Sequence, residues 1–232
     1  MKKNANYFFI FTLTILFAVC PLKPASAQIG GYIGIWGGYT ISPEASSRDY
    51  HDWNYYNRYD LDIQETWGVG VKVGYTLPQE KCIAFEFEYS YLNPDINRSV
   101  LGRYGSDFVV VDGDVKLNNF MFNVIAKYPQ GRFHPYVGGG IGFSYTDMSA
   151  TATQSSNGVT SSAPVGKDYT SFAYQLLTGV EIDIVNNLSM DIGYRYFATE
   201  IEFGNNTKID FENNTKIDFT TSMITLGLKF LF

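Results

Sequence analysis

The chain has 232 residues, a formal net charge of −6, 22 glycines and 17% aromatic residues. The acidic balance excludes the electrostatic footprint of a nucleic-acid-binding protein, because phosphate backbones attract clustered Lys and Arg. Abundant glycine and aromatic residues favour many strands over a helical core. The length suits one folded domain.

The first 27 residues have the pattern of a secretory signal peptide. Lys2 and Lys3 precede an apolar segment over residues 7–20, and residues 25–27 are small, as at a cleavage site before Gln28. The apolar segment is shorter than the roughly 20 residues of a membrane-spanning helix. We therefore expect residues 1–27 to be removed.

A lipoprotein signal at Cys20 is the alternative, and the bulky Val19 before it disfavours this interpretation. Cleavage after residue 27 removes three lysines and no acid, so the net charge moves from −6 to −9. Residues 28–232 then form the mature chain, which we expect to be a single domain.

Eight segments of the mature chain alternate two kinds of side chain with a period of two, as strands between two environments do. In the clearest segment, Trp67 and Val71 share an apolar face, whereas Lys72 and several glycines share the other. The eight segments cover residues 32–41, 67–77, 82–91, 120–128, 135–145, 172–184, 188–198 and 223–232.

The connections between these segments alternate between short turns and long polar loops. The apolar face is rich in aromatic residues, especially toward the strand ends. Together these features predict an all-β fold: an eight-stranded antiparallel up-and-down transmembrane β-barrel with short periplasmic turns and long extracellular loops. Closure gives every backbone group a partner, as lipid demands. The alternative is a soluble β-sandwich, with its charged face in water.

The chain resembles the small eight-stranded outer-membrane barrels of the OmpA/OmpX and opacity type. The resemblance covers residues 29–232 and rests on "YIGIWGGY", "FMFNVIAKYP", "HPYVGGGIGFSY", "YQLLTGVEI", "LSMDIGYRYF" and the terminal "LGLKFLF". It implies a location in the outer membrane of a Gram-negative-type envelope, contact with outer-membrane lipid, and recognition of a terminal Phe by the barrel-assembly machinery. The expected assembly signal comprises Phe232, Phe230 and Leu228.

The face turned away from lipid carries charges of both signs, which must pair when buried. The expected lumen ion network consists of Lys72, Glu86, Glu88, Lys127, Glu181, Asp191 and Arg195. In OmpA-like barrels such a network is implied to plug the channel. A gate is the functional alternative to this static polar core.

The alternation inverts at two places beyond the membrane segments. Before Phe120, the formerly apolar face becomes polar at residues 112, 114, 116 and 118, while Val109, Val111, Val115 and Leu117 turn inward. After Ala198, Glu200 and Glu202 turn outward and Ile201 and Phe203 inward. We expect both strands to continue above the bilayer, around a dry core.

Two outer loops have contrasting compositions. The first, residues 43–60, clusters aromatic side chains that suit ligand or surface binding, although girdle and loop packing would explain them equally. The candidate surface-binding residues are Tyr50, Trp53, Tyr55, Tyr56 and Tyr59. The third loop, residues 146–168, is rich in Ser and Thr and is expected to be mobile and exposed.

A tandem repeat of eight residues occupies positions 205–212 and 213–220. Because eight is even, the copy keeps each side chain on its former face. We expect an extended hairpin between the seventh and eighth strands, with Ile217 and Phe219 inward and Asp218 outward. Replication slippage in a tolerant loop explains its origin.

Enzymatic activity is not expected, although lipid-modifying barrels place a His with Ser or Asp at the outer rim. His51 lies in the first outer loop, and Ser99, Ser106 or Asp107 are its conceivable partners. His134 lies at a periplasmic turn, the wrong end. We expect no catalytic residue, cofactor or metal site.

The sequence thus predicts a non-enzymatic, surface-exposed, monomeric barrel with a structural or adhesive role through its outer loops. Its partner would be a host or envelope ligand and no nucleic acid. The alternatives are a narrow porin-like channel and a lipid-modifying barrel enzyme.

Overall fold

A computed structural model describes residues 30–48, 58–61, 63–78, 81–104, 107–156, 159–203 and 215–232. The expected signal peptide lies outside these residues. The strands are β1 (Gly30–Arg48), β2 (Arg58–Leu61), β3 (Trp67–Thr76), β4 (Ile83–Leu92), β5 (Asp95–Tyr104), β6 (Asp107–Lys127), β7 (Phe133–Ser156), β8 (Val159–Val185), β9 (Leu188–Phe203) and β10 (Thr215–Leu231). Within the described ranges, no helix has the length and hydropathy of a membrane span.

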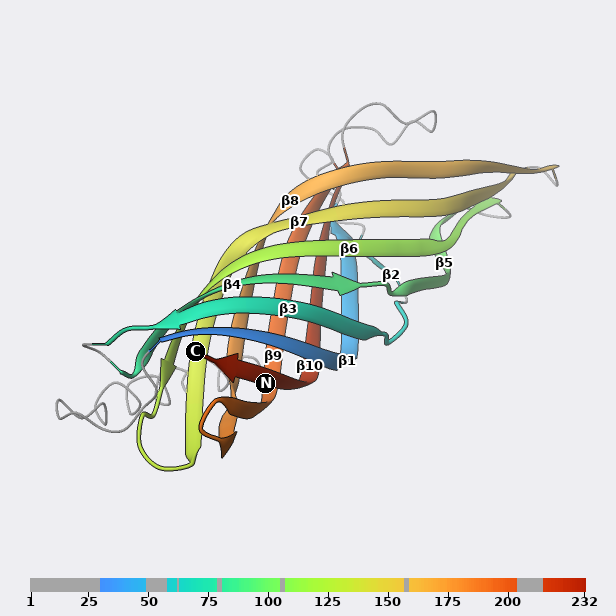
Figure 1. The fold of residues 1–232 in the computed structure, drawn as a ribbon. Helices are drawn as coiled ribbons and strands as arrows, with labels where there is room; N and C mark the ends of the chain where they lie inside the picture. Colours follow the sequence, from blue (N-terminus) through green and yellow to red (C-terminus); the bar gives the residue numbers. More distant parts are fainter. Residues whose placement is uncertain are drawn as a thin grey trace.

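Eight strands form a closed antiparallel barrel in the order β1-β3-β4-β6-β7-β8-β9-β10 (Figure 1). β10 pairs back with β1 from Tyr32↔Leu231 to Arg48↔Lys216 and closes the ring, with one register shift between Ile41 and Glu44. All eight predicted segments fall within these strands to within one residue at either end, so the predicted fold class is confirmed. The sequence did not predict β2 and β5, which extend the wall by pairing with the outer parts of β1 and β6.

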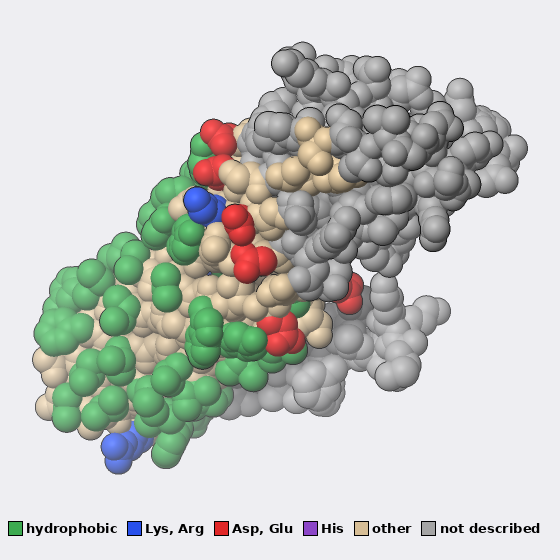
Figure 2. Space-filling model, turned by 90° about the vertical axis from the view of Figure 1, so that its right-hand side faces the viewer, with side chains coloured by type: hydrophobic (Ala, Val, Ile, Leu, Met, Phe, Trp, Pro, Cys, Tyr) green, Lys and Arg blue, Asp and Glu red, His purple; other side chains and the backbone are tan. Residues whose placement is uncertain are grey.

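The apolar faces of the strands form a belt around the outside of the barrel. Residues such as Ile35, Val71, Phe122 and Leu226 remain about half exposed because they face outward. Figure 2 shows this apolar belt over one side of the molecule, with acidic side chains gathered near its outer edge. This is the surface that lipid covers in a transmembrane barrel.

The predicted inversion of the alternation is present in β6. Val115 and Leu117 are buried, whereas Asp114 and Lys116 are exposed. The wall of the barrel therefore continues beyond the belt around an apolar interior. The side chains of residues 109, 111 and 112, and those of residues 200–203, lie outside the described part of the structure.

The expectation of a mobile loop at residues 146–168 is wrong. β7 and β8 pair without interruption from Phe133↔Ile182 to Ser156↔Val159 and form one long hairpin (Figure 1). Backbone hydrogen bonds hold such an extension without apolar side chains, and the many Thr residues suit extended backbone. The Ser- and Thr-rich composition therefore did not indicate that this segment forms the outer parts of β7 and β8.

The second copy of the tandem repeat lies partly in β10. β9 and β10 remain paired as far as Phe203↔Thr215, so the two strands do project beyond the belt. Phe219 is buried and faces inward, as predicted, whereas Asp218 is on the outward face. The tip of this hairpin, residues 204–214, lies outside the described residues.

We predict that the folded protein migrates as a compact form on detergent gels and shifts on boiling, because a closed barrel has no edge from which to unravel. Leu226→Pro removes one N–H from the β10 strand and adds no charge, so it should abolish the compact form. Leu226→Val is the control, and this variant should still migrate as the compact form. Identical migration of the unboiled and boiled wild-type protein would contradict closure.

We also predict that Phe232→Ala lowers the outer-membrane level several-fold more than Phe133→Ala. Both phenylalanines are exposed at the periplasmic edge, at 73% and 59%, but only Phe232 belongs to the expected assembly signal. A substitution of Lys229, which lies in the same strand, would be unsuitable as a control, because this residue is buried and ion-paired. Quantified membrane fractions measure the effect, and equal levels of both variants would remove the support for a terminal signal.

Candidate functional site

The lumen of the barrel gathers its charged side chains because strand alternation turns them all to the same side. All seven predicted network residues are buried, and Lys229 from β10 joins them. With Lys229, the network in the described lumen joins four cations, Lys72, Lys127, Arg195 and Lys229, to four carboxylates, Glu86, Glu88, Glu181 and Asp191. The buried charges therefore balance.

One ion pair crosses the lumen between opposite walls. β4 and β9 stand four places apart in the ring of eight strands. Both terminal nitrogens of Arg195 on β9 donate hydrogen bonds to the Glu88 carboxylate, and the Nη2–Oε2 distance is 2.9 Å. Its Nη1 also donates to Gln175 Oε1 at 3.0 Å, and its guanidinium lies 4.1 Å from the centre of the Trp36 ring. A bidentate, stacked arginine is among the strongest ionic arrangements in proteins.

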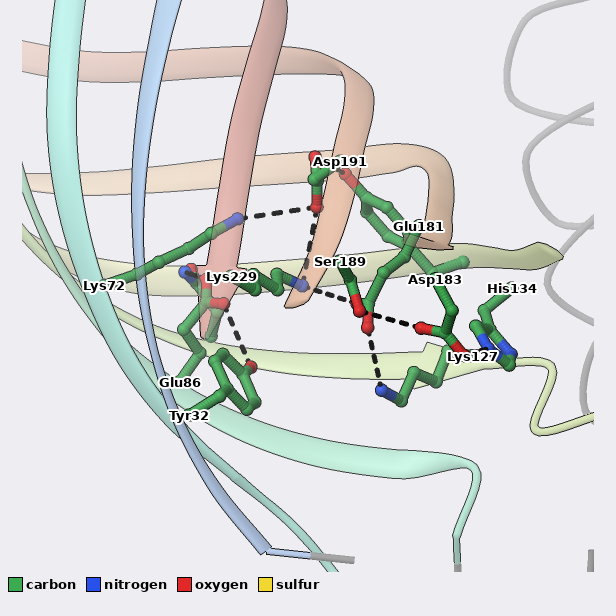
Figure 3. A network of polar contacts seen from close by, with 12 residues as sticks. Tyr32, Lys72, Glu86, Lys127, His134, Glu181, Asp183, Ser189, Asp191 and Lys229 are labelled. Atoms are coloured by element: carbon green, nitrogen blue, oxygen red, sulfur yellow. Dashed lines mark hydrogen bonds and ion pairs between the residues drawn. The ribbon is translucent and has the colours of Figure 1, made fainter. Parts of the chain in front are cut away.

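A second group of ion pairs lies nearer the periplasmic end (Figure 3). Lys229 Nζ is 2.8 Å from Glu181 and 3.4 Å from Asp191. Lys127 also contacts Glu181, at 3.4 Å, and Lys72 contacts Asp191, at 3.5 Å. Each of these two carboxylates thus lies between two lysines.

Neutral side chains extend both groups, and Lys229 Nζ, which lies 5.0 Å from the centre of the Tyr32 ring, joins them into one network. Tyr32 and Asn123 donate to the two oxygens of Glu86, at 3.0 and 3.1 Å. Gln175 donates to Asn123 at 2.7 Å, and Tyr136 donates to Asp191 at 3.0 Å. Every strand of the barrel ring contributes at least one side chain, so the network ties the entire wall together.

Inward-facing glycines make room for the large members of the lumen. A Cβ on Gly74 would clash with the ring of Tyr32, and a Cβ on Gly70 would lie 2.5 Å from the indole of Trp36. The space left between the network and Trp36 is a cavity of about 10 Å³. This is at the lower limit for a single water molecule.

A layer of apolar side chains fills the lumen beyond the ions. It packs residues from both the belt region and the outer extensions around Trp36, away from water. The cluster consists of Trp36, Ile63, Leu92, Val115, Leu117, Met121, Ala173, Phe197, Phe219 and Met223. An ion moving along the axis would have to pass both this layer and the charged network.

The periplasmic mouth holds a contact that the sequence did not predict. His134 Nε2 lies 2.9 Å from Asp183 Oδ2, and its Nδ1 lies 2.9 Å from the carbonyl oxygen of Tyr128. Ser189 donates to the other Asp183 oxygen at 2.7 Å. Here the carboxylate lies between the hydroxyl and the imidazole, so the histidine does not contact the hydroxyl as a general base would.

Other predicted site residues fall in different places. Phe232, Phe230 and Leu228 lie exposed on the outer face. The aromatic residues of the first outer loop, together with His51 and the side chains of Tyr59, Ser99 and Asp107, lie outside the described residues. Within the described residues, no group of three or more His, Cys, Asp or Glu side chains could hold a metal ion.

The lumen contacts predict how stability responds to charge removal. Arg195→Met leaves Glu88 buried without its cation and should lower the free energy of unfolding by about 3–5 kcal/mol. The double variant Arg195→Met/Glu88→Leu removes both charges, so its free energy of unfolding should fall clearly less than that of the single variant. Urea unfolding in lipid vesicles measures both, and equal losses would show that the pair contributes no specific coupling.

The described geometry agrees with comparisons to known proteins. A family model for the outer membrane protein beta-barrel domain matches residues 9–230. No curated protein sequence matches significantly.

Among solved structures, OprG from Pseudomonas aeruginosa is 18% identical, with 90% of this chain and 100% of that chain covered and a TM-score of 0.52. The outer membrane protein AlkL is 17% identical, with 91% and 94% covered and a TM-score of 0.50. Neisserial surface protein A is 17% identical, with 88% and 97% covered and a TM-score of 0.46. The chain belongs to the outer membrane protein beta-barrel family and is located in the outer membrane.

Proposed function

We propose that this protein is a non-enzymatic, non-conducting barrel that presents its extended strands at the cell surface for structural or adhesive contacts. The observation that carries the proposal is the charge-balanced network that joins all eight strands across the lumen. Because side chains fill the interior of the barrel, we infer that its functional contacts are made by its outer surface.

The closed lumen argues against the alternative of a narrow pore. Opening a path would separate Arg195 from Glu88, and each charge would lose its partner within a low-dielectric interior. The apolar layer around Trp36 would also have to part. Eight strands enclose a space that side chains can fill, whereas barrels of 16–18 strands leave an aqueous channel.

The outer extensions are the surface that remains for function. β6, β7 and β8 continue together well beyond the ends of β3 and β4 (Figure 1). Their length is not needed to cross a bilayer, because about 9–11 tilted residues suffice for a strand. The clustered aromatics of the first outer loop, Tyr50 to Tyr59, are candidates for direct contact with a host or envelope ligand.

The described histidine does not favour an enzyme. His134 lies at the periplasmic mouth and contacts Asp183 and a backbone carbonyl. Lipid-modifying chemistry at the cell surface would need its base at the opposite rim. The proposal therefore assigns His134 to closing the lumen.

Conductance tests the proposal. We expect the wild-type protein to give no stable single-channel steps in planar bilayers. Arg195→Ser/Glu88→Ser shortens two facing side chains and keeps the lumen neutral, so it should produce small, unstable conductance. The control Asp114→Ser/Lys116→Ser removes a cation and an anion that are both exposed and should stay silent. A stable wild-type channel would overturn the proposal and favour the pore.

A further inference from the structure

The barrel wall splits beyond the apolar belt, where β8 leaves β9. Ala173↔Thr199 is the last pair that joins the two strands. Beyond it, β8 continues against β7 as far as Val159, whereas β9 continues against β10 as far as Phe203. Figure 1 shows β6, β7 and β8 running together away from β9 and β10.

A pocket of about 640 Å³ occupies this split. Its size falls within the ~300–1,000 Å³ that is typical of small-molecule sites. Strand alternation shows that the pocket is lined by outward and inward side chains alike, so it reaches from the outer surface into the wall. The lining residues are Tyr169, Thr170, Ser171, Phe172 and Tyr174 of β8, Tyr196, Ala198 and Thr199 of β9, and Asp218 and Thr220 of β10.

Hydroxyl groups dominate this lining. Seven of the ten residues carry one: Tyr169, Thr170, Ser171, Tyr174, Tyr196, Thr199 and Thr220. One of them is already engaged, since Thr199 donates to the Phe172 carbonyl oxygen at 3.0 Å. A hydroxyl that donates one bond can still accept others. A ligand that displaces water here must therefore offer many hydrogen-bonding groups.

Aromatic faces provide the apolar part of the site. The rings of Tyr174 and Tyr196 lie 6.5 Å apart and are tilted by 46°. Phe172 is 63% exposed beside them. Flat rings of this kind bury large apolar area at little entropic cost, and they suit the C–H faces of a sugar ring.

The charge of the pocket narrows the ligand class further. Asp218 is the charged residue of the described lining, and its carboxylate makes this end of the pocket acidic. A phosphate or sulfate group would be repelled at this place. A quaternary ammonium would suit the carboxylate and the rings, but it would leave the hydroxyls without partners.

We propose that the pocket between β8, β9 and β10 binds an uncharged saccharide. Sugar hydroxyls would bond to the polar lining and to the Asp218 carboxylate, while a sugar face covers Tyr174 or Tyr196. The site lies where the exposed Phe172 and Tyr174 mark the outer edge of the belt, so both the headgroup of a glycolipid and a free glycan can reach it. The proposal does not depend on whether the lumen conducts.

The test uses the isotope-labelled full barrel in phosphatidylcholine nanodiscs, followed by NMR of the amides of residues 169–174 and 196–199. The probes are digalactosyl diacylglycerol in the bilayer, free lactose in solution, and phosphatidylglycerol as a lipid with an anionic headgroup and no sugar. Tyr174→Leu removes a ring and hydroxyl, and Tyr75→Leu is its lipid-facing control. Asp218→Asn removes the carboxylate, and Asp168→Asn is its control on the same outer rim.

We expect saturable shifts with a sugar probe, at least tenfold weaker affinity in Tyr174→Leu and Asp218→Asn, and unchanged affinity in both controls. Binding of the glycolipid alone identifies a membrane headgroup as the source, whereas binding of lactose as well identifies a free glycan. Shifts with neither sugar, equal shifts with phosphatidylglycerol, or insensitivity to both pocket variants would overturn the proposal. Failure here would leave the conductance result, and with it the proposed function, untouched.

Discussion

A strand in lipid must give every backbone N–H and C=O a partner from another strand, because the hydrocarbon offers none. The pairing of β10 with β1 meets this requirement by closing the ring. Closure then places one face of every strand toward lipid and the other toward a narrow lumen. The apolar belt, the ion network and the positions of the inward glycines all follow from this division of each strand into a lipid-facing and a lumen-facing side.

Closure of the ring also constrains the charges in the lumen. A closed ring of eight strands leaves little room for water, so the inward charges must neutralise one another. They do so across the barrel rather than along one strand, as the pair of Arg195 on β9 with Glu88 on β4 illustrates. The interior that excludes ions therefore also braces the wall, and this links the stability of the fold to its impermeability.

Period-two alternation was sufficient to predict the eight strands, because each is half lipid-facing and half lumen-facing. It also placed the charged residues of these strands, Lys229 among them, on the inner face, but it did not reveal which of them pair. Tyr32 and Tyr136 were not predicted as network members, because the network was inferred from the charged side chains alone. The long β7–β8 hairpin was missed because Ser and Thr residues conceal a strand whose stability comes from backbone pairing. Contacts such as His134 with Asp183 join residues far apart in the chain, and no local pattern indicates them.

The central claim is that charged side chains, and not water, fill the lumen. Hydrogen exchange of the Arg195 guanidinium and the Lys229 ammonium, observed by NMR in a lipid bilayer, tests it most directly. A closed network predicts side-chain protons that exchange far more slowly than those of the exposed Lys116. Exchange of the lumen groups as fast as that of Lys116 would show a hydrated channel and would contradict the account.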